Sequence, residues 1–226
     1  MDKPRICLVV TASDTEQAVG AIKRATGLGP DLIEVRLDYM KGAVELSRVN
    51  EATIIPLIAT NRSMDQGGFW GGEEEDRVQL LMAACDAGFN YVDLELSTRS
   101  MDDVVDDIRG SGASLIVSYH DFEKTPGIKD LRRIMREERE AGADICKVVG
   151  TARSLADNLV YLRFLQENQG ANLVCFGMGE AGRISRILSP LFGGVYTYAS
   201  SGIGDESAPG QLTLTDMRTI YKILGV

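Results

Sequence analysis

The chain has 226 residues, of which 44% are hydrophobic and 25% charged, and its formal net charge is −9. This composition is typical of globular proteins and excludes an intrinsically disordered chain. The acidic balance argues against nucleic-acid binding, which depends on clustered lysine and arginine. No apolar run approaches the ~18 residues of a membrane span, and the first residues lack a secretory signal. We therefore expect a cytoplasmic protein that binds no membrane.

The cysteine and histidine content argues against a metal site. Cys7, Cys85, Cys146 and Cys175 lie far apart and form no CxxC pair, so we expect buried, reduced thiols. His120 is the only histidine, which excludes sites built from several histidines. A magnesium site made of carboxylates alone stays open at this point.

Eight short apolar or β-branched runs alternate with stretches of helical periodicity. The predicted strands are residues 6–10, 32–36, 54–59, 91–95, 114–120, 145–149, 173–177 and 195–199. Two of the predicted helices span 73–87 and 155–169, whose apolar stripes include Val78, Leu81, Met82 and Cys85 in the first and Leu159, Leu162 and Phe164 in the second. Eight such units predict an α/β fold, a (β/α)8 TIM barrel that forms a single domain over residues 1–226. An open, doubly wound sheet is the alternative.

Residue parity separates an apolar from a polar face on several predicted strands. Residues two apart share a face, and the face covered by helices should be apolar. That outer face would carry Ile33, Val35, Leu37, Val92, Leu94, Leu96, Leu115, Val117, Tyr119, Cys146 and Val148. The opposite face would carry Glu34, Arg36, Asp93, Glu95, Ser118, His120 and Lys147. Buried charges are costly unless paired, and barrel active sites lie at the carboxyl ends of the strands. The pattern predicts a site for a small polar molecule.

Two proton-handling residues lie near the ends of consecutive strands: His120 closes SLIVSYH, and Lys147 closes DICK. A lysine amine among apolar residues should have a lowered pKa, and a neutral amine attacks ketones. For each residue alone, the alternative to a catalytic role is a structural histidine or a lysine whose amine extends to solvent. The two together on the inner face favour a Schiff-base enzyme with a histidine acid and base.

The segment GMGEAG, residues 177–182, formally matches the dinucleotide-binding fingerprint. It falls in the seventh of eight units, which leaves no room for the rest of a nucleotide-binding half, so we favour glycines that serve a turn and close packing. Arg183 and Arg186 follow this segment at helical spacing, and Arg186 is the candidate binding residue. Its guanidinium is suited to binding a substrate carboxylate, and a surface arginine is the alternative.

Two glycine-containing segments follow predicted strands. Residues 60–72 read TNRSMDQGGFWGG and residues 200–211 read SSGIGDESAPGQ. We interpret both as lids on the catalytic rim, with long surface loops as the alternative.

Several motifs together resemble type I 3-dehydroquinate dehydratase. They are EVRLDY at 34–39, SYHDFEKTP at 118–126, CKVV at 146–149, GRISR at 182–186 and SAPGQ at 207–211. The resemblance covers nearly the whole chain. It implies a (β/α)8 barrel, a homodimer, and dehydration of 3-dehydroquinate to 3-dehydroshikimate in the shikimate route to aromatic amino acids, with no cofactor and no metal.

The same resemblance assigns residue roles. Lys147 matches the Schiff-base lysine and His120 the general base and acid, a double role suited to a pKa near ~6.5. Arg186 matches the arginine that binds the substrate carboxylate. The positions that match binders of the hydroxyls and ring are Glu34, Arg36, Arg62, Ser207 and Gln211. The residues expected to line the pocket are Met178, Tyr198 and Ala208.

Two positions depart from the family pattern. Gln66 stands where relatives often have a glutamate, which would orient the histidine and stabilise its protonated form. An amide can orient the histidine without supplying charge, so we predict a lower His120 pKa than in those relatives. Phe176 stands where many relatives have methionine.

Two other functions compete with the dehydratase. A class I aldolase would also use a lysine imine on the sixth strand, but its substrates are commonly phosphorylated, and the eighth unit lacks an evident glycine-rich phosphate nest. The second alternative is a non-catalytic barrel that binds a small molecule.

Overall fold

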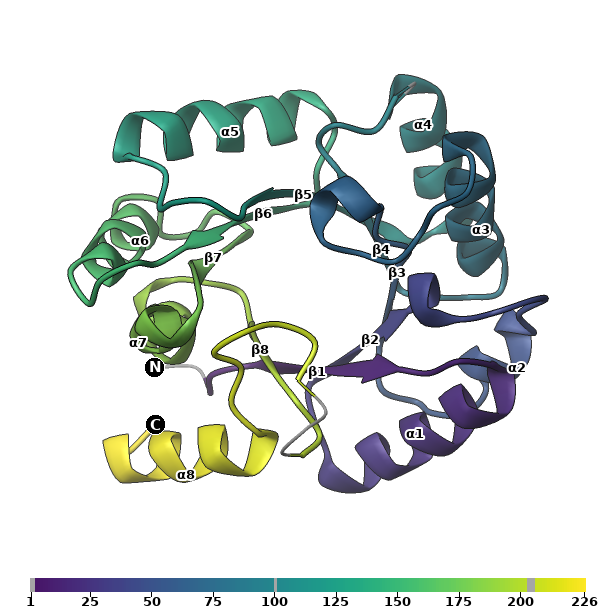
Figure 1. Cartoon of the computed structure of the whole chain (residues 1–226), viewed down its shortest axis with the longest axis horizontal. Helices are drawn as coiled ribbons and strands as arrows, with labels where there is room; N and C mark the ends of the chain where they lie inside the picture. The colour runs from purple at the N-terminus through teal and green to yellow at the C-terminus, as the bar shows by residue number, and fades with distance from the viewer. Residues whose placement is uncertain (1–2, 100, 203–205) are drawn as a thin grey trace.

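A computed structural model describes residues 3–99, 101–202 and 206–226. Within these ranges, eight strands form a ring with helices outside it (Figure 1). The strands are β1 Ile6–Thr11, β2 Leu32–Arg36, β3 Leu57–Thr60, β4 Tyr91–Glu95, β5 Ser114–Asp121, β6 Ile145–Thr151, β7 Leu173–Met178 and β8 Thr197–Ala199. The α-helices are α1 Thr15–Leu28, α2 Leu46–Asn50, α3 Glu74–Asp86, α4 Met101–Ser111, α5 Ile128–Glu140, α6 Asp157–Glu167, α7 Arg183–Leu188 and α8 Leu214–Leu224. Short 3₁₀ turns are η1 Leu37–Tyr39, η2 Met64–Gln66, η3 Glu180–Gly182 and η4 Ser189–Phe192.

The strands form a nearly closed parallel barrel. Their order is β7-β6-β5-β4-β3-β2-β1-β8, and every ladder is parallel. A backbone hydrogen bond of 3.0 Å from Val195 N to Leu173 O links the segment before β8 to β7. The predicted (β/α)8 barrel is confirmed, and the open doubly wound sheet is wrong.

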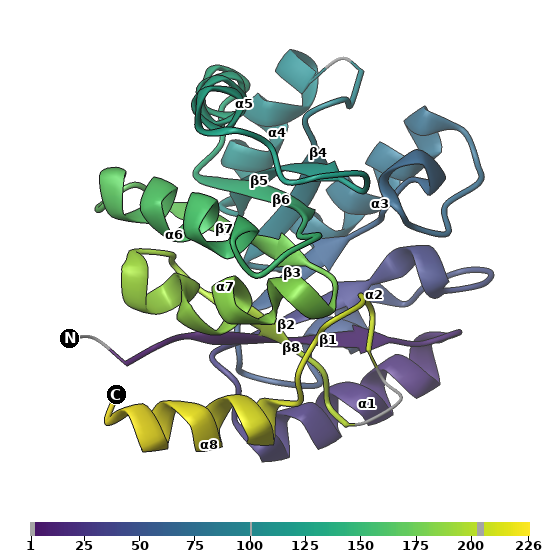
Figure 2. The same ribbon diagram turned by 60° about the vertical axis from the view of Figure 1, so that its left-hand side comes forward.

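The last helix packs beside the first (Figure 2). Arg218 of α8 donates to the carbonyl oxygens of Leu28 and Gly29 at the end of α1. Gly29 caps α1 in the left-handed region, at φ 67°, where residues with a side chain are strained. None of the helices in the described ranges is long and apolar enough to cross a membrane.

Most predicted element bounds agree with the structure to within two residues. The third strand begins at Leu57 and not at Ile54, because Pro56 has no N–H to donate to a ladder; Ile54 is 99% exposed. The eighth strand begins at Thr197, two residues later than predicted. On α6, Leu159 was expected in the buried stripe but is 67% exposed, whereas Leu162 and Phe164 are buried.

The predicted two-faced strands are confirmed. The outward side chains pack against the helices in two apolar layers, while a third apolar cluster fills the barrel interior. All four cysteines are buried and free, as expected, with Cys7 inside the barrel.

The barrel interior changes from apolar to polar along the strands. On β2 the inward positions run from Leu32 through Glu34 to Arg36, and on β5 they lead from Ile116 to Ser118. The inward positions nearer the amino ends of these strands pack in the apolar cluster, so the polar positions lie at the carboxyl ends. This gradient places the functional site at that end of the barrel.

Candidate active site

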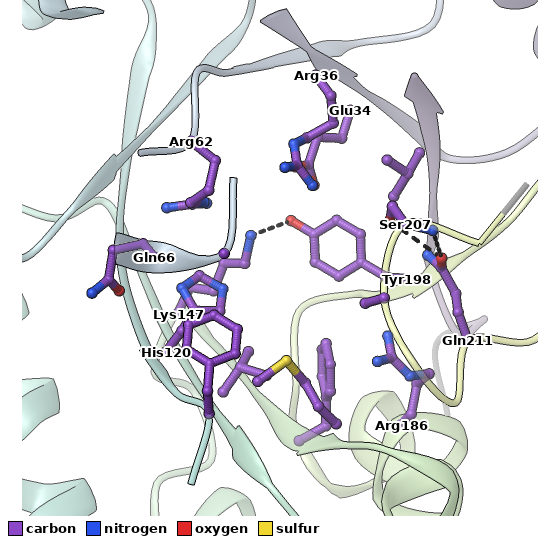
Figure 3. Close-up of a pocket in the computed structure, with 17 residues that line it drawn as sticks. Glu34, Arg36, Arg62, Gln66, His120, Lys147, Arg186, Tyr198, Ser207 and Gln211 are labelled. Carbon is purple, nitrogen blue, oxygen red and sulfur yellow. Dashed lines mark hydrogen bonds between the residues drawn. The ribbon is translucent and has the colours of Figure 1, made fainter. Parts of the chain in front are cut away.

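One pocket at the carboxyl ends of the strands collects side chains from distant parts of the chain (Figure 3). It is lined by Val9, Glu34, Arg36, Arg62, Gln66, Gly67, His120, Phe122, Lys147, Val149, Phe176, Met178, Arg186, Tyr198, Ser207, Ala208 and Gln211. Every residue that the sequence assigned to the site lies on this lining. Their catalytic and binding roles remain predictions.

Lys147 lies inside the barrel, with only 4% of its surface exposed. Its Nζ donates to Asp93 Oδ2 at 2.7 Å and to the Tyr198 hydroxyl at 3.0 Å. The expected apolar surroundings are therefore wrong, because Cys146 and Val148, its neighbours in sequence, point outward. Lys147 therefore has a buried carboxylate as its ion-pair partner. The amine must lose a proton before it can act as a nucleophile.

Asp93 connects Lys147 with Arg62 and Ser118 through hydrogen bonds. Its Oδ1 accepts hydrogen bonds from Arg62 Nη2 at 2.7 Å and from Ser118 Oγ at 2.6 Å. Burial alone would raise the pKa of Asp93, but Arg62 and Lys147 outweigh burial and hold that pKa far below its usual range. Asp93 is thus a fixed anion, and sequence reasoning placed it on the inner face without assigning it to the site.

Two of the three predicted binding arginines already have acid partners. Arg62 pairs with Asp93 and, at 3.2 Å, with Glu95. Arg36 forms a two-point pair with Asp38, at 2.9 Å from Nε and 2.7 Å from Nη2. Their positions on the lining are fixed by these pairs.

Arg186 is the third, and its environment is different. It is 2% exposed, so the surface-arginine alternative is wrong. Its Nε has no hydrogen-bond partner within the described residues, and its Cζ lies 4.4 Å from the centre of the Phe176 ring. Burial lowers the pKa of Arg186 to about 10. A buried, unpaired guanidinium at a pocket is suited to an anionic ligand.

His120 lies on the same lining as Lys147. Burial, followed by the charges of Arg62 and Lys147, lowers the pKa of His120 well below its usual value, so the expected titration near 6.5 is wrong. Its ring stacks on Phe122 at a centroid distance of 6.0 Å and an angle of 17°. A neutral imidazole at neutral pH is ready to accept a proton.

Gln66 also lines the pocket, but it does not orient His120 through Nδ1. That nitrogen is buried without a hydrogen-bond partner among residues 3–99, 101–202 and 206–226. The comparison of the His120 pKa with that of relatives that have glutamate stays a prediction.

The first predicted lid, residues 60–72, is folded against the rim. A bridge pairs Ser63 with Trp70, and Gly68 N donates to Ser63 O at 2.8 Å. A Cβ on Gly68 would lie 2.0 Å from Arg62 O, so this turn requires glycine. A Cβ on Gly67 would lie 2.7 Å from the Phe122 ring. The loop therefore packs tightly over the aromatic residue beside His120.

The second predicted lid, residues 200–211, contributes three residues to the lining. Gln211 Oε1 accepts from Ser207 N at 2.8 Å and from Ser207 Oγ at 3.2 Å. Gly179 N donates to Pro209 O at 3.1 Å, which ties this loop to the turn after β7. Residues 203–205 of the predicted lid lie outside the described residues. Motion of either loop stays a prediction.

The glycines of residues 177–182 serve close packing. A Cβ on Gly182 would lie 2.3 Å from Gly177 O, and the segment forms the turn from β7 through η3 into α7. The structural interpretation of this motif is confirmed.

Comparison with known proteins agrees with this geometry. The sequence model of the type I 3-dehydroquinase family matches residues 6–226. The chain belongs to this family. The resemblance found in the motifs is confirmed, and membership makes the chain an enzyme of the hydro-lyase class.

Individual type I 3-dehydroquinases are similar over nearly their full length. The 3-dehydroquinate dehydratase of Methanothermobacter thermautotrophicus is 38% identical, over 98% of this chain and 96% of its own. The crystal structure of 3-dehydroquinate dehydratase from Geobacillus kaustophilus has a TM-score of 0.90 to this chain at 32% identity. The match covers 99% of this chain and 91% of that one. The Clostridium difficile enzyme, crystallised with covalently modified comenic acid, has a TM-score of 0.88 at 25% identity, covering 99% and 93%.

Proposed function

We propose that this chain dehydrates 3-dehydroquinate to 3-dehydroshikimate, a step of the shikimate route, through an imine on Lys147. The observation that carries the proposal is the pocket itself, which holds a buried amine, a neutral imidazole and an unpaired guanidinium. These three groups are what imine chemistry on a keto acid requires: a nucleophile, a proton carrier and a carboxylate receptor.

The first half of the reaction forms the imine. Lys147 gives up a proton to His120, and its nitrogen then attacks the C3 ketone to give a carbinolamine. His120 returns the proton to the former ketone oxygen, which leaves as water, and the protonated imine that remains withdraws electrons from C2. Asp93, the fixed anion 2.7 Å from Nζ, stabilises that positive charge.

The second half eliminates the C1 hydroxyl. His120 removes the proton from C2, and the electron pair enters the imine to form an enamine. The enamine expels the C1 hydroxyl, which leaves as water with a proton returned by His120. Water then hydrolyses the imine, so the net reaction releases one water. The lowered pKa of His120 keeps the imidazole in the unprotonated form that can start this half.

Substrate positioning is assigned to the remaining lining residues. Arg186 binds the carboxylate, because that charge neutralises its buried guanidinium. The hydroxyls and ring are bound by Glu34, Arg36, Arg62, Ser207 and Gln211. The last two belong to the loop whose Pro209 O accepts a hydrogen bond from Gly179 N.

The homodimer, the cytoplasmic location and the single-domain organisation expected from the sequence are proposed as well. Light scattering of the purified protein, cell fractionation and limited proteolysis would check them in turn.

Borohydride reduction in the presence of 3-dehydroquinate, followed by peptide mass analysis, tests the proposed function. We expect a reduced adduct on the peptide that contains Lys147, and none in Lys147→Ala. His120→Ala should still form the adduct, more slowly because His120 also returns a proton during imine formation, and should turn over ~10²- to 10⁴-fold more slowly. Equal loss of the adduct in both variants would contradict this division of labour.

The same experiment addresses the competing functions. Family membership favours the dehydratase over an aldolase. Release of 3-dehydroshikimate by the wild-type protein would exclude a non-catalytic barrel, and its absence under conditions that trap the adduct would contradict the proposal.

A further inference from the structure

We propose that Tyr198 is a further catalytic residue. Its phenol is a hydrogen-bond partner of Lys147 in the free enzyme, and during turnover it donates to the oxygen that leaves the imine carbon. This inference rests on the proposed function of Lys147.

Tyr198 reaches Lys147 across the barrel. It lies on β8, which pairs with β1, whereas Lys147 lies on β6. The phenol oxygen is 3.0 Å from Nζ, and Nζ lies 4.6 Å from the ring centroid (Figure 3). Tyr198 is 4% exposed and lines the pocket. The hydroxyl is therefore beside the nitrogen at which the new bond would form.

The hydrogen bond between Lys147 and Tyr198 must change when the imine forms, because the lysine nitrogen then carries fewer hydrogens. An ammonium has three hydrogens and can donate to both Asp93 and Tyr198, whereas a protonated imine has one. Asp93 is charged and closer, at 2.7 Å against 3.0 Å, so it keeps the remaining hydrogen. Formation of the imine thus releases the Tyr198 hydroxyl from its role as acceptor.

The released phenol is a donor. Burial, together with the negative charge of Glu34, raises the pKa of Tyr198 well above its usual value, so the hydroxyl keeps its proton throughout the working pH range. The Tyr196 hydroxyl lies 3.5 Å from the Tyr198 hydroxyl. A hydrogen bond from Tyr196 would make Tyr198 a better donor.

The oxygen that needs this donor is one atom away from the lysine nitrogen. In the carbinolamine, Nζ and the hydroxyl oxygen are bonded to the same carbon, so a group next to Nζ is within reach of that oxygen. The carbon–oxygen bond breaks, the electron pair leaves with the oxygen, and the proton that completes water comes from protonated His120. Tyr198 stabilises the departing oxygen by a hydrogen bond and keeps its own proton. The same contact assists imine hydrolysis in reverse.

Tyr198→Phe tests the inference, because it removes only the hydroxyl. Tyr221→Phe is the matched control: Tyr221 is also buried and donates one hydrogen bond, to Ile187 O at 2.8 Å, but it lies on α8 outside the pocket. Rapid mixing with 3-dehydroquinate, with borohydride added at timed intervals, measures imine formation on Lys147. Multiple-turnover assays with substrate deuterated at C2 show which step limits the rate.

We expect Tyr198→Phe to slow imine formation about 10- to 100-fold, the effect of losing one hydrogen bond to developing charge. The final adduct yield should stay complete, and the C2 isotope effect should fall towards one as imine formation becomes limiting. Tyr221→Phe should match the wild type in both measurements. An unchanged rate in Tyr198→Phe would overturn the inference and leave the proposed function intact. Failure of the wild type to form any adduct would instead overturn the proposed function.

A second variant covers the case in which Tyr198→Phe does not fold. Incorporation of 3-fluorotyrosine at position 198 keeps the ring and hydroxyl and makes the phenol a stronger donor. Imine formation should then be faster than in the wild type. An unchanged or slower rate would overturn the inference.

Discussion

Lys147 and Arg186 are two buried cations on the lining of one pocket, and their surroundings are opposite in kind. Lys147 has a carboxylate at 2.7 Å, whereas Arg186 lies against an aromatic ring, with no carboxylate of the described chain paired to it. An unpaired buried charge costs several kcal/mol. The cation proposed to form a bond thus has a fixed counter-charge, whereas the charge of the other is left for the ligand to neutralise. In the free protein the positive charge of Arg186 is therefore available to pair with an anionic ligand.

Removing the fixed counter-charge should give the largest effect. In Asp93→Asn, Lys147 and Arg62 lose the anion between them, and we expect a loss of about 3–5 kcal/mol in unfolding free energy. kcat/KM should fall about 10³-fold because the imine loses its stabilising charge. Urea unfolding and steady-state kinetics measure the two effects. A fully active variant would show that Asp93 serves only the fold.

Replacing the unpaired cation Arg186 should change stability and activity in opposite directions. In Arg186→Met, the substrate carboxylate loses its partner, so kcat/KM should fall about 10²-fold, chiefly through KM. The free protein should become more stable by about 1–3 kcal/mol, because an unpaired buried charge is replaced by an apolar side chain. Stability that fell as in Asp93→Asn would mean that Arg186 is already neutralised, and the contrast would be lost.

Glu138 provides a third case, on the outer side of the barrel wall. Neither carboxylate oxygen has a hydrogen-bond partner in the described part of the chain, and burial raises the pKa of Glu138 to about 9. A carboxyl whose pKa is higher in the folded state stabilises least at high pH, so its contribution is lost as pH rises from about 4.5 towards 9. Glu138→Met should therefore gain stability relative to the wild type as pH rises through this range, by about 1.4 kcal/mol for each pH unit. A difference in unfolding free energy that stays constant from pH 5 to pH 9 would show that the carboxyl is not the titrating group.

A new acid near His120 should have the smallest effect. Because the pKa of His120 is lowered, its base form persists into acid, and the acidic limb of kcat/KM should lie below pH 6.5. Gln66→Glu supplies a carboxylate that favours the protonated imidazole, so the limb should move to higher pH by about one unit. An unchanged limb would reject this account of Gln66.

The sequence predicted the parts of the site that depend on local pattern. Strand alternation placed Lys147, His120 and Asp93 on the inner face, because side-chain direction follows from the position of a residue within its strand. Arg186 was proposed from its position and its guanidinium chemistry, and the motif resemblance added the residues of the two loops.

What sequence reasoning missed depends on contacts across the barrel. The pairing of Lys147 with Asp93 joins residues 54 positions apart, and that with Tyr198 joins residues 51 apart. The packing of Phe122 under Gly67 likewise follows from the tertiary fold. The expectation of apolar surroundings for Lys147 was wrong for the same reason: its neighbours in the chain are on the other face of β6.

The most direct test of the account is the origin of the ketone oxygen in the product. Imine formation at C3 releases the substrate's ketone oxygen, and hydrolysis replaces it with oxygen from solvent. In water enriched in oxygen-18, 3-dehydroshikimate collected by rapid quench after one turnover should carry the heavy isotope at its ketone. Spontaneous exchange of the ketone oxygen is measured in a control without enzyme. Product that carries no more oxygen-18 than this control would contradict an imine on Lys147.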